Sequence, residues 1–408
     1  MTTADVTTAD VTTVDLVITD ALLHEGEPAE ADVVVHDGRI VAVGPGAGRG
    51  RTASRTLAAA GASLLPGLID AHFHAYATSL DAWRLENAPL SYVALAGARR
   101  LSRALRRGFT TVRDVAGGDA GLDQAIAAGL IESPRYLWTG PAMSQTGGHG
   151  DPRAADTDVC FHSGPMNQVV DGVDDLRVAA RDRFRRGAHA LKIMTSGGVV
   201  SPTDPIRVPQ YSAEEIRAVT EEARRRGSYV AAHAYSPEAI RHSIANGVRS
   251  IEHGNLLDED TAVAMAEAQA FLVPTLAAYD AMDRRWQEVA LSPVQRAKNA
   301  EVLDHGLRSV RRAQQAGVRV GFGTDLMADL EDDQLCGLRL QAEAIGWQAA
   351  LRSATGVNAE LIGRPDLGRV EVGATADLLL LDGPLTDDQT LLWDGRRNRT
   401  VVQGGVLK

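Results

Sequence analysis

The sequence repeats one phrase along most of its length: a polar helical stretch ends in glycine, and a short apolar run follows. Five copies read ALRRGFTTVRDV, FRRGAHALKIMTSGG, ARRRGSYVAAHAY, IANGVRSIEHGN and QQAGVRVGFGTDL. Glycine readily closes a helix, and an apolar, β-rich run after it forms a buried strand. Together with LPGLIDAHFH, RYLWTGPAMS and FLVPTL, the phrase predicts strands near 66–74, 109–116, 135–141, 189–195, 229–234, 250–253, 271–276 and 318–325.

Eight such strands with helical patterns between them predict an α/β fold, a (β/α)8 TIM barrel. The flanking segments instead alternate at period two, as in ADVVVHDGRIVAVG before the barrel and TVVQGGVLK after it. We expect residues 14–63 and 365–408 to form one small β-sandwich domain from both termini, with the barrel at 64–364. Residues 2–16 hold a five-residue repeat (TTADV, TTADV, TTVDL), and residues 1–13 are predicted to be a disordered terminus.

The composition argues against several classes of protein. Of 408 residues, 44% are hydrophobic and 23% charged, as in ordinary globular enzymes. No window approaches about 18 consecutive apolar residues, and the first residues lack the basic and apolar regions of a secretory signal.

Two cysteines, Cys160 and Cys336, cannot form a disulfide framework, which fits a reducing cytoplasm. A net charge of −11 argues against nucleic acid and membranes as partners. We expect a cytoplasmic protein acting on a small molecule; a homo-oligomer stays open.

Residues able to bind a metal stand at the carboxyl ends of the predicted strands. His72 and His74 lie two apart and share one face of their strand, so both point into the barrel while Phe73 points outward. Further strands end in Lys192, His233, His253 and Asp325. Barrel active sites are built where these strand ends meet, so all six side chains are expected at one mouth.

Each of these residues alone has an ordinary structural explanation. A histidine pair can pack in a core, a strand-end aspartate can cap the next helix, and Lys192 could pair with Asp325 in a metal-free barrel. Six of them at one depth on five strands instead predict a metal site. Imidazole and carboxylate ligands suit Zn²⁺, and Mn²⁺, Fe²⁺, Co²⁺ or Ni²⁺ are chemically compatible.

The motifs LPGLIDAHFH, LKIMTSGG, AHAY, IEHG and GTD, in this order, resemble the amidohydrolase superfamily, the metal-dependent hydrolases of urease and dihydroorotase type. The resemblance covers nearly the whole chain and is greatest to the imidazolonepropionase-like, prolidase-like branch. It implies two divalent ions, most readily Zn²⁺: His72, His74 and Asp325 would bind one, and His233 and His253 the other. Lys192 would be carboxylated by CO₂ to N6-carboxylysine and bridge both.

Simple chemistry agrees with these implied roles. A bare ammonium group would be repelled by two cations, whereas a carbamate offers two anionic oxygens. Two metals would lower the pKa of a water from about 15.7 to about 7. Asp325 could accept its proton and deliver it to the leaving nitrogen. Tyr235, in HAY, could hydrogen-bond a substrate carbonyl or carboxylate, or simply pack at the rim.

Two long segments, 140–168 and 196–212, follow the third and fourth strands and are expected to contribute to the site. His149, between two glycines, is a candidate substrate contact. Arg153 and Arg207 could bind a substrate carboxylate together with Tyr235 and His149. This set predicts cleavage of a dipeptide or N-acyl amino acid, as by an Xaa-Pro dipeptidase, carboxypeptidase or ochratoxinase. One alternative is hydrolysis of a phenylurea, carbamate or thiocarbamate; a remote one is a silent barrel scaffold, against which the six filled ligand positions argue.

Overall fold

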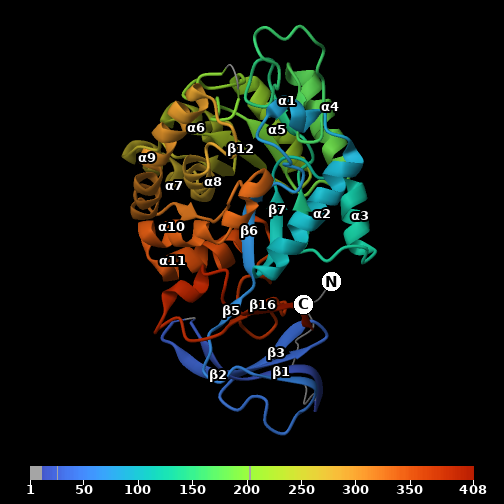
Figure 1. The fold of residues 1–408 in the computed structure, drawn as a ribbon, viewed down its shortest axis with the longest axis vertical. Coiled ribbons are helices and arrows are strands. Elements are labelled where there is room, and N and C mark those ends of the chain that lie inside the picture. The colour runs from blue at the N-terminus through green and yellow to red at the C-terminus, as the bar shows by residue number, and fades with distance from the viewer. Residues whose placement is uncertain (1–11, 25, 202–203) are drawn as a thin grey trace.

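The computed structural model describes residues 12–24, 26–201 and 204–408. A barrel surrounded by helices lies at one end of the molecule, and a smaller unit of β-strands from both ends of the chain lies at the other (Figure 1). The terminus predicted to be disordered, residues 1–13, falls outside the described residues except for its last two. Thr13 already begins the first strand, β1 (Thr13–Leu23).

The barrel strands follow the repeated phrase of the sequence, and each predicted strand has a counterpart. They are β6 (Leu68–Phe73), β7 (Phe109–Asp114), β8 (Arg135–Trp138), β11 (Leu191–Met194), β12 (Val230–Ala234), β13 (Ser250–His253), β14 (Phe271–Val273) and β15 (Arg319–Val320). Neighbours along this series pair in parallel from β6 to β8 and from β11 to β15. Two short strands of the first long segment, β9 (Ala142–Ser144) and β10 (Asn167–Val169), extend the second sheet beside β11.

Backbone hydrogen bonds join the two sheets into a ring. On one side the amide of Ala71 in β6 donates to the carbonyl of Phe322 at 2.9 Å, just after β15. On the other side the amide of His189 donates to the carbonyl of Trp138 at 2.8 Å, next to β8 and β11. The chain therefore forms the expected (β/α)8 barrel, with the ends of β6, β11, β12 and β13 opening at the same mouth.

The helices begin and end where the local chemistry requires. Ser212 and Ser292 form capping boxes with Glu215 and Gln295, each satisfying amide groups at a helix start. All five glycines that close the repeated phrase adopt positive φ angles, from 65° to 101°: Gly108, Gly187, Gly227, Gly247 and Gly317. The helices are α1 (Ala82–Glu86), α2 (Leu90–Arg106), α3 (Ala120–Ala127), α4 (Val173–Arg185), α5 (Ala213–Arg225), α6 (Pro237–Ala245), α7 (Glu259–Glu267), α8 (Leu276–Arg284), α9 (Pro293–Gln315), α10 (Cys336–Ile345), α11 (Trp347–Arg352) and α12 (Asn358–Leu361).

The small β unit consists of two four-stranded sheets. One has the order β3-β2-β1-β4, with β2 (Ala29–His36), β3 (Arg39–Gly44) and β4 (Thr52–Ala58). The other has the order β18-β17-β16-β5, with β5 (Leu64–Pro66), β16 (Leu378–Leu381), β17 (Arg399–Gln403) and β18 (Val406–Leu407). The second sheet thus includes β5, from the start of the predicted barrel range, so the division at 63/64 stays a prediction.

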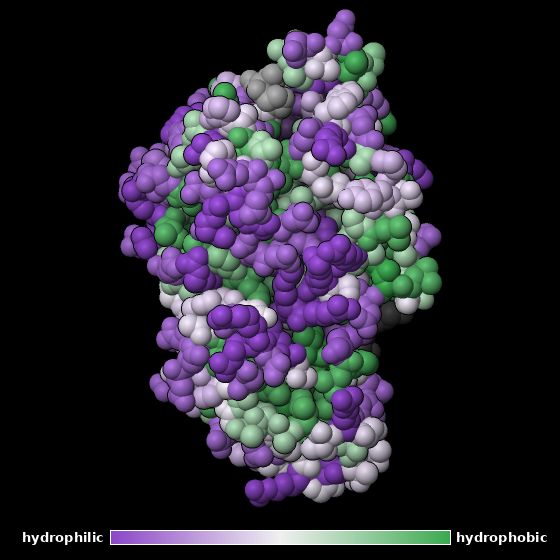
Figure 2. All heavy atoms as spheres, in the orientation of Figure 1, coloured by the Kyte–Doolittle hydropathy of each residue, from purple (hydrophilic) through white to green (hydrophobic). Residues whose placement is uncertain are grey.

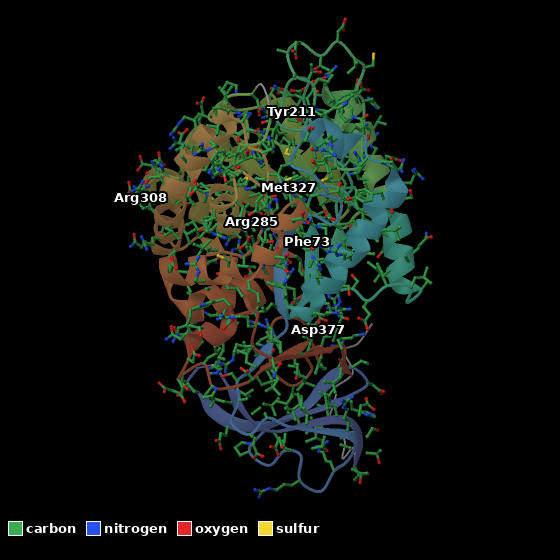
Figure 3. All side chains as sticks on the ribbon, in the orientation of Figure 1. Phe73, Tyr211, Arg285, Arg308, Met327 and Asp377 are labelled. Carbon is green, nitrogen blue, oxygen red and sulfur yellow. The ribbon has the colours of Figure 1, made fainter. Side chains whose placement is uncertain are left out.

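The run of leucines in β16 is buried on both faces and connects the two parts of the molecule. Leu378 and Leu380 pack in the core of the small unit, whereas Leu379 and Leu381 pack in the main barrel core. An ion pair reinforces this junction, since Arg135 Nη1 lies 2.6 Å from Asp377 Oδ2, and Figure 3 shows Asp377 between the barrel and the small unit.

The visible surface is mostly polar. Figure 2 shows hydrophilic side chains over much of the barrel face, with apolar side chains near α3 and over the small β unit. Across the described part of the chain, no helix combines the length and apolar character needed to cross a membrane.

Candidate active site

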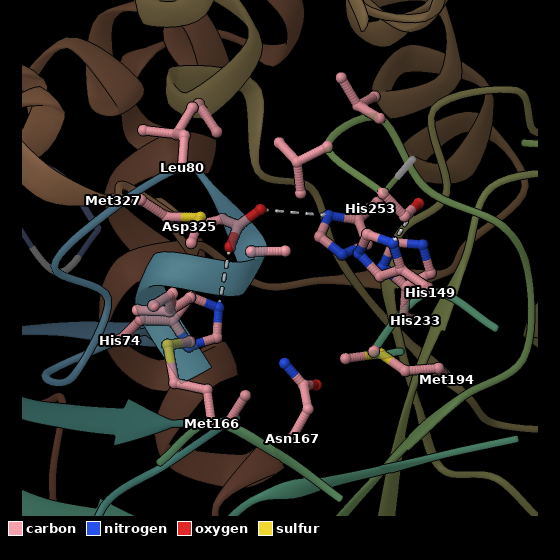
Figure 4. A pocket seen from close by; sticks show the side chains of 18 of the residues that line it. His74, Leu80, His149, Met166, Asn167, Met194, His233, His253, Asp325 and Met327 are labelled. Atoms are coloured by element: carbon pink, nitrogen blue, oxygen red, sulfur yellow. Dashed lines mark hydrogen bonds and ion pairs between the residues drawn. The ribbon is translucent and has the colours of Figure 1, made fainter. Parts of the chain in front are cut away.

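A pocket opens at the carboxyl ends of the barrel strands. The structure brings all six predicted metal ligands to its wall: His72, His74, Lys192, His233, His253 and Asp325. Figure 4 shows Asp325 between His74 on one side and His253 on the other.

Asp325 connects the histidines. Its Oδ1 lies 2.9 Å from Nε2 of His74 and 3.4 Å from Nε2 of His72, and its Oδ2 lies 3.9 Å from Nδ1 of His253. Donor atoms of His72, His253 and Asp325 lie within 4.8 Å of one another, close enough to share one ion. Burial raises the pKa of Asp325, but His72 and His74 outweigh this effect and hold it well below its usual value. The carboxylate is therefore ionised and able to bind a cation.

A buried carboxylate orients His72, and a second one lies near His74. Nδ1 of His72 lies 2.7 Å from Oε2 of Glu252, and the Arg113 guanidinium donates to Oε1 of the same carboxylate at 2.8 Å. Nδ1 of His74 lies 3.7 Å from Oδ1 of Asp114. A carboxylate beside one imidazole nitrogen leaves the other nitrogen free for a metal, as in most metal-binding histidines.

Hydroxyl groups and a backbone carbonyl contact the other two histidines. The hydroxyls of Thr275 and Tyr279 lie 2.7 and 2.8 Å from Nδ1 of His253. His233 donates from Nε2 to the carbonyl of Gly197 at 3.0 Å. Burial and neighbouring cationic groups keep the pKa of both imidazoles well below the usual value, so both are neutral, as a metal ligand must be.

Lys192 lies on β11 with only 3% of its surface exposed. Burial lowers its pKa to about 8, although Glu252 and Asp325 favour the charged form. A neutral amine is the form that reacts with CO₂. The donor set therefore fits divalent ions: four imidazoles, one carboxylate and a lysine whose amine loses its proton easily.

Two of the candidate ligands have unusual backbone conformations. His253 has a φ of 74° and Asp325 a φ of 54°. Residues other than glycine rarely adopt this region, and where they do the strain is commonly part of a functional site. At the end of β13 the conformation turns His253 toward the pocket, although Glu252 beside it points into the barrel.

His149 and Tyr235, predicted to contact substrate, also line the pocket. The His149 ring stacks on the His233 ring with centroids 4.1 Å apart, and its Nδ1 lies 2.9 Å from the hydroxyl of Ser201. The Tyr235 hydroxyl lies 2.7 Å from that of Tyr279. Both long segments therefore reach the pocket, through His149 from the first and Ser201 from the second.

The structure does not bring Arg153 and Arg207 to the pocket. Arg153 turns back on its own loop and forms two hydrogen bonds with Asp151, at 2.8 and 2.6 Å. Arg207 donates from Nε to Glu301 at 2.9 Å on the surface. Each guanidinium already has a local carboxylate, and neither belongs to the pocket wall. The expected carboxylate-binding set is thus reduced to His149 and Tyr235.

Several residues line the pocket although nothing in the sequence indicated that they would. Four methionines line it, together with leucines and valines: Met166, Met194, Met282, Met327, Leu80, Leu85, Leu330, Val199 and Val200. Glu86 and Asn167 are the polar exceptions in this wall. They come from α1 and from the end of the first long segment, and only tertiary packing shows that they meet.

Histidines, a lysine and an aspartate that converge at the carboxyl mouth of a barrel are typical of a metal-dependent hydrolase. The Amidohydrolase family model matches residues 63–407, and the chain belongs to this family. Ochratoxinase from Aspergillus niger is 30% identical over 363 residues, covering 84% of this chain and 75% of that protein.

Solved structures agree with this assignment. A prolidase complexed with N-methylphosphonate-L-proline is 40% identical, with a TM-score of 0.90, and the match covers 96% of this chain and 99% of that one. A Xaa-Pro dipeptidase with methionine bound in its active site is 28% identical, with a TM-score of 0.83 and coverage of 96% and 99%. The chain is a hydrolase that acts on carbon–nitrogen bonds.

Proposed function

We propose that the chain is a binuclear amidohydrolase that cleaves the amide bond of a small dipeptide or N-acyl amino acid. The observation that carries this proposal is the buried Lys192 on the wall shared by His72, His74, His233, His253 and Asp325. The similarity to a prolidase and to ochratoxinase supports an amide substrate.

The residues divide into two candidate ligand groups. His72, His74 and Asp325 would hold one divalent ion, His233 and His253 the second, and Lys192 as N6-carboxylysine would bridge both. Zn²⁺ fits the imidazole-rich set best. When bound, such ions lower the pKa of water toward about 7 and polarise a carbonyl group.

The chain's own groups supply the proton transfer and the orientation. Asp325 accepts the proton of the attacking water and returns it to the leaving nitrogen, since it is ionised at neutral pH. Tyr235 donates a hydrogen bond to the substrate carbonyl or carboxylate, because burial and the neighbouring Tyr279 and Asp325 keep the pKa of its hydroxyl well above the usual value. His149 contacts the same part of the substrate from the facing loop.

A second candidate function has one observation in its favour. Among the pocket residues in the described ranges there is no arginine, and the wall is rich in methionine, leucine and valine. Such a wall also suits a neutral phenylurea, carbamate or thiocarbamate. We place the amide first because the prolidase is 40% identical to this chain.

Both cysteines are free thiols, which supports a reducing, cytoplasmic location.

The test is a hydrolysis panel on the zinc-loaded protein. We expect proline to be released from leucyl-proline or 4-methylpentanoyl-proline, and not by a Lys192→Ala variant purified in parallel, which controls for contaminating peptidases. Aniline release from a neutral phenylurea without proline release from either amide would favour the second candidate.

A further inference from the structure

Glu86 is a buried carboxylate on the pocket wall that the proposed chemistry does not use. It ends the short helix α1 with 5% of its surface exposed. Its Oε1 accepts a hydrogen bond from the Asn167 side chain at 2.6 Å, and its Oε2 accepts from the backbone amides of Met166 and Asn167 at 3.2 and 3.3 Å. The carboxylate is thus fixed in place by three donors.

None of these donors carries a charge. The pocket wall holds two carboxylates, and Asp325 pairs with His74 at 2.9 Å. Glu86, in contrast, has no lysine, arginine or histidine at ion-pair distance anywhere in the described ranges. An ionised carboxylate can accept about four hydrogen bonds, and burying it without a cation is costly. Burial accordingly raises the pKa of Glu86 to about 7.

The surroundings of Glu86 are apolar. Leu85 precedes it, Met166 precedes its hydrogen-bond partner Asn167, and both line the same pocket. Figure 4 shows the Asn167 amide pointing into the pocket on the wall facing Asp325. A ligand that supplied a cation here would therefore place an apolar body along the methionine and leucine side chains, with its reacting carbonyl toward Asp325.

Building on the proposed amidase function, we propose that the Glu86 carboxylate, oriented by Asn167, binds the protonated amino group of the substrate. The preferred substrate class is then an apolar aminoacyl compound with a free α-amine, such as a dipeptide, rather than an N-acyl amino acid. Ammonium–carboxylate pairing in a desolvated site is strong and directional.

The decisive experiment measures binding without turnover. Calorimetry on the zinc-loaded protein compares 3-methylbutylamine with 3-methylbutanol, which have the same apolar body. We expect the wild type to bind the amine at least ~10-fold more tightly, the usual scale of a charge-assisted hydrogen bond. Glu86→Gln should abolish this difference. Direct coordination of the amine to zinc would survive the substitution, so equal amine affinity in wild type and Glu86→Gln overturns the inference.

Two further variants guard against a merely structural effect. Glu86→Asp keeps the charge and should keep part of the preference for the amine, whereas Asp382→Asn, a surface change, should alter nothing. If Glu86 only anchors the loop through Met166 and Asn167, all Glu86 variants will weaken amine and alcohol binding alike, which overturns the inference.

A substrate pair separates this inference from the proposed function. Leucyl-proline and 4-methylpentanoyl-proline differ only in the α-amine. We expect higher kcat/KM for leucyl-proline, and loss of that advantage through KM in Glu86→Gln. Equal kcat/KM for both would overturn the amine site while supporting the amidase. Cleavage of neither would contradict the amidase, and the calorimetry would still decide the amine site.

Discussion

Nδ1 of His72 lies 2.7 Å from Oε2 of Glu252, so a buried carboxylate fixes the orientation of the first candidate metal ligand. In the metal-loaded protein this contact would hold the imidazole proton on Nδ1 and leave Nε2, which lies 3.4 Å from Asp325 Oδ1, to bind the metal. Burial raises the pKa of Glu252, but Arg113 and His72 outweigh it and hold the pKa below the ordinary value. Glu252 is therefore ionised at neutral pH.

Glu252→Gln should weaken metal binding by about 10- to 100-fold, because the amide holds His72 less firmly and lowers its basicity. It should also destabilise the fold by about 3–5 kcal/mol, since Arg113 loses its only buried counter-charge in the described structure. Competition with a chromophoric chelator and thermal unfolding measure the two effects. Glu301→Gln, on the surface, is the control. Unchanged zinc affinity would contradict the orienting role.

Lys192→Ala should reduce metal occupancy and activity by orders of magnitude, because the variant loses the proposed bridging carbamate. Added short carboxylic acids should restore part of the activity by occupying the vacated space. Steady-state rates with and without acetate or propionate provide the measurement. Normal turnover by the variant would rule out a bridging carbamate.

Asp325→Asn should lower kcat by at least ~10²-fold, the usual scale for loss of a general acid–base group. Much of the fold and metal should remain, since an amide is nearly the same size. Metal content measured beside steady-state kinetics distinguishes the roles. An unchanged kcat would mean that Asp325 acts only as a ligand.

Metal affinity should fall as the pH is lowered from about 9 to about 7. For each proton that the metal displaces, the fall should be up to about tenfold per pH unit. Burial lowers the pKa of His74, but Asp114 and Asp325 outweigh this and raise it to about 9. Lys192, lowered to about 8, must also lose its proton before it can form a carbamate. Both groups hold protons below these values, so protons compete with the metal. Calorimetric zinc titrations in buffers of different ionisation enthalpy should reveal proton release; its absence would refute this explanation.

Arg207→Ala should leave kcat/KM for a carboxylate-bearing substrate within about twofold of wild type and stability within about 0.5 kcal/mol. The reason is that 57% of the Arg207 side chain is exposed and it pairs with Glu301, away from the pocket. A large rise in KM for an acidic substrate, with none for a neutral one, would show that the loop moves to bring this arginine to the substrate.

The sequence was sufficient to predict the barrel and to bring six candidate metal ligands together. The glycines that end the helices indicate where each strand begins, and the carboxyl ends of parallel strands must meet at one mouth. Period-two alternation correctly placed His72 and His74 on one face. It could not place Glu252, because alternation next to an inward His253 predicts an outward Glu252. The positive φ of His253 breaks that alternation and lets both side chains face the barrel interior.

The pocket-lining residues outside the candidate metal site could not be predicted from the sequence, for a different reason. Glu86 and Asn167 are 81 positions apart and meet only because the first long segment folds across α1. Arg153 looked available for a substrate carboxylate, but Asp151, two residues earlier, already binds it. The spacing of residues along the sequence cannot show which charged side chains of a loop form ion pairs with each other.

The most direct test of the central claim is the metal stoichiometry of the purified protein, measured by atomic spectrometry on wild type and Lys192→Ala. The binuclear assignment predicts about two divalent ions per wild-type chain and fewer than about one in the variant. Wild-type protein that binds no divalent ion under zinc-replete conditions, or binds the same number as Lys192→Ala, would contradict it.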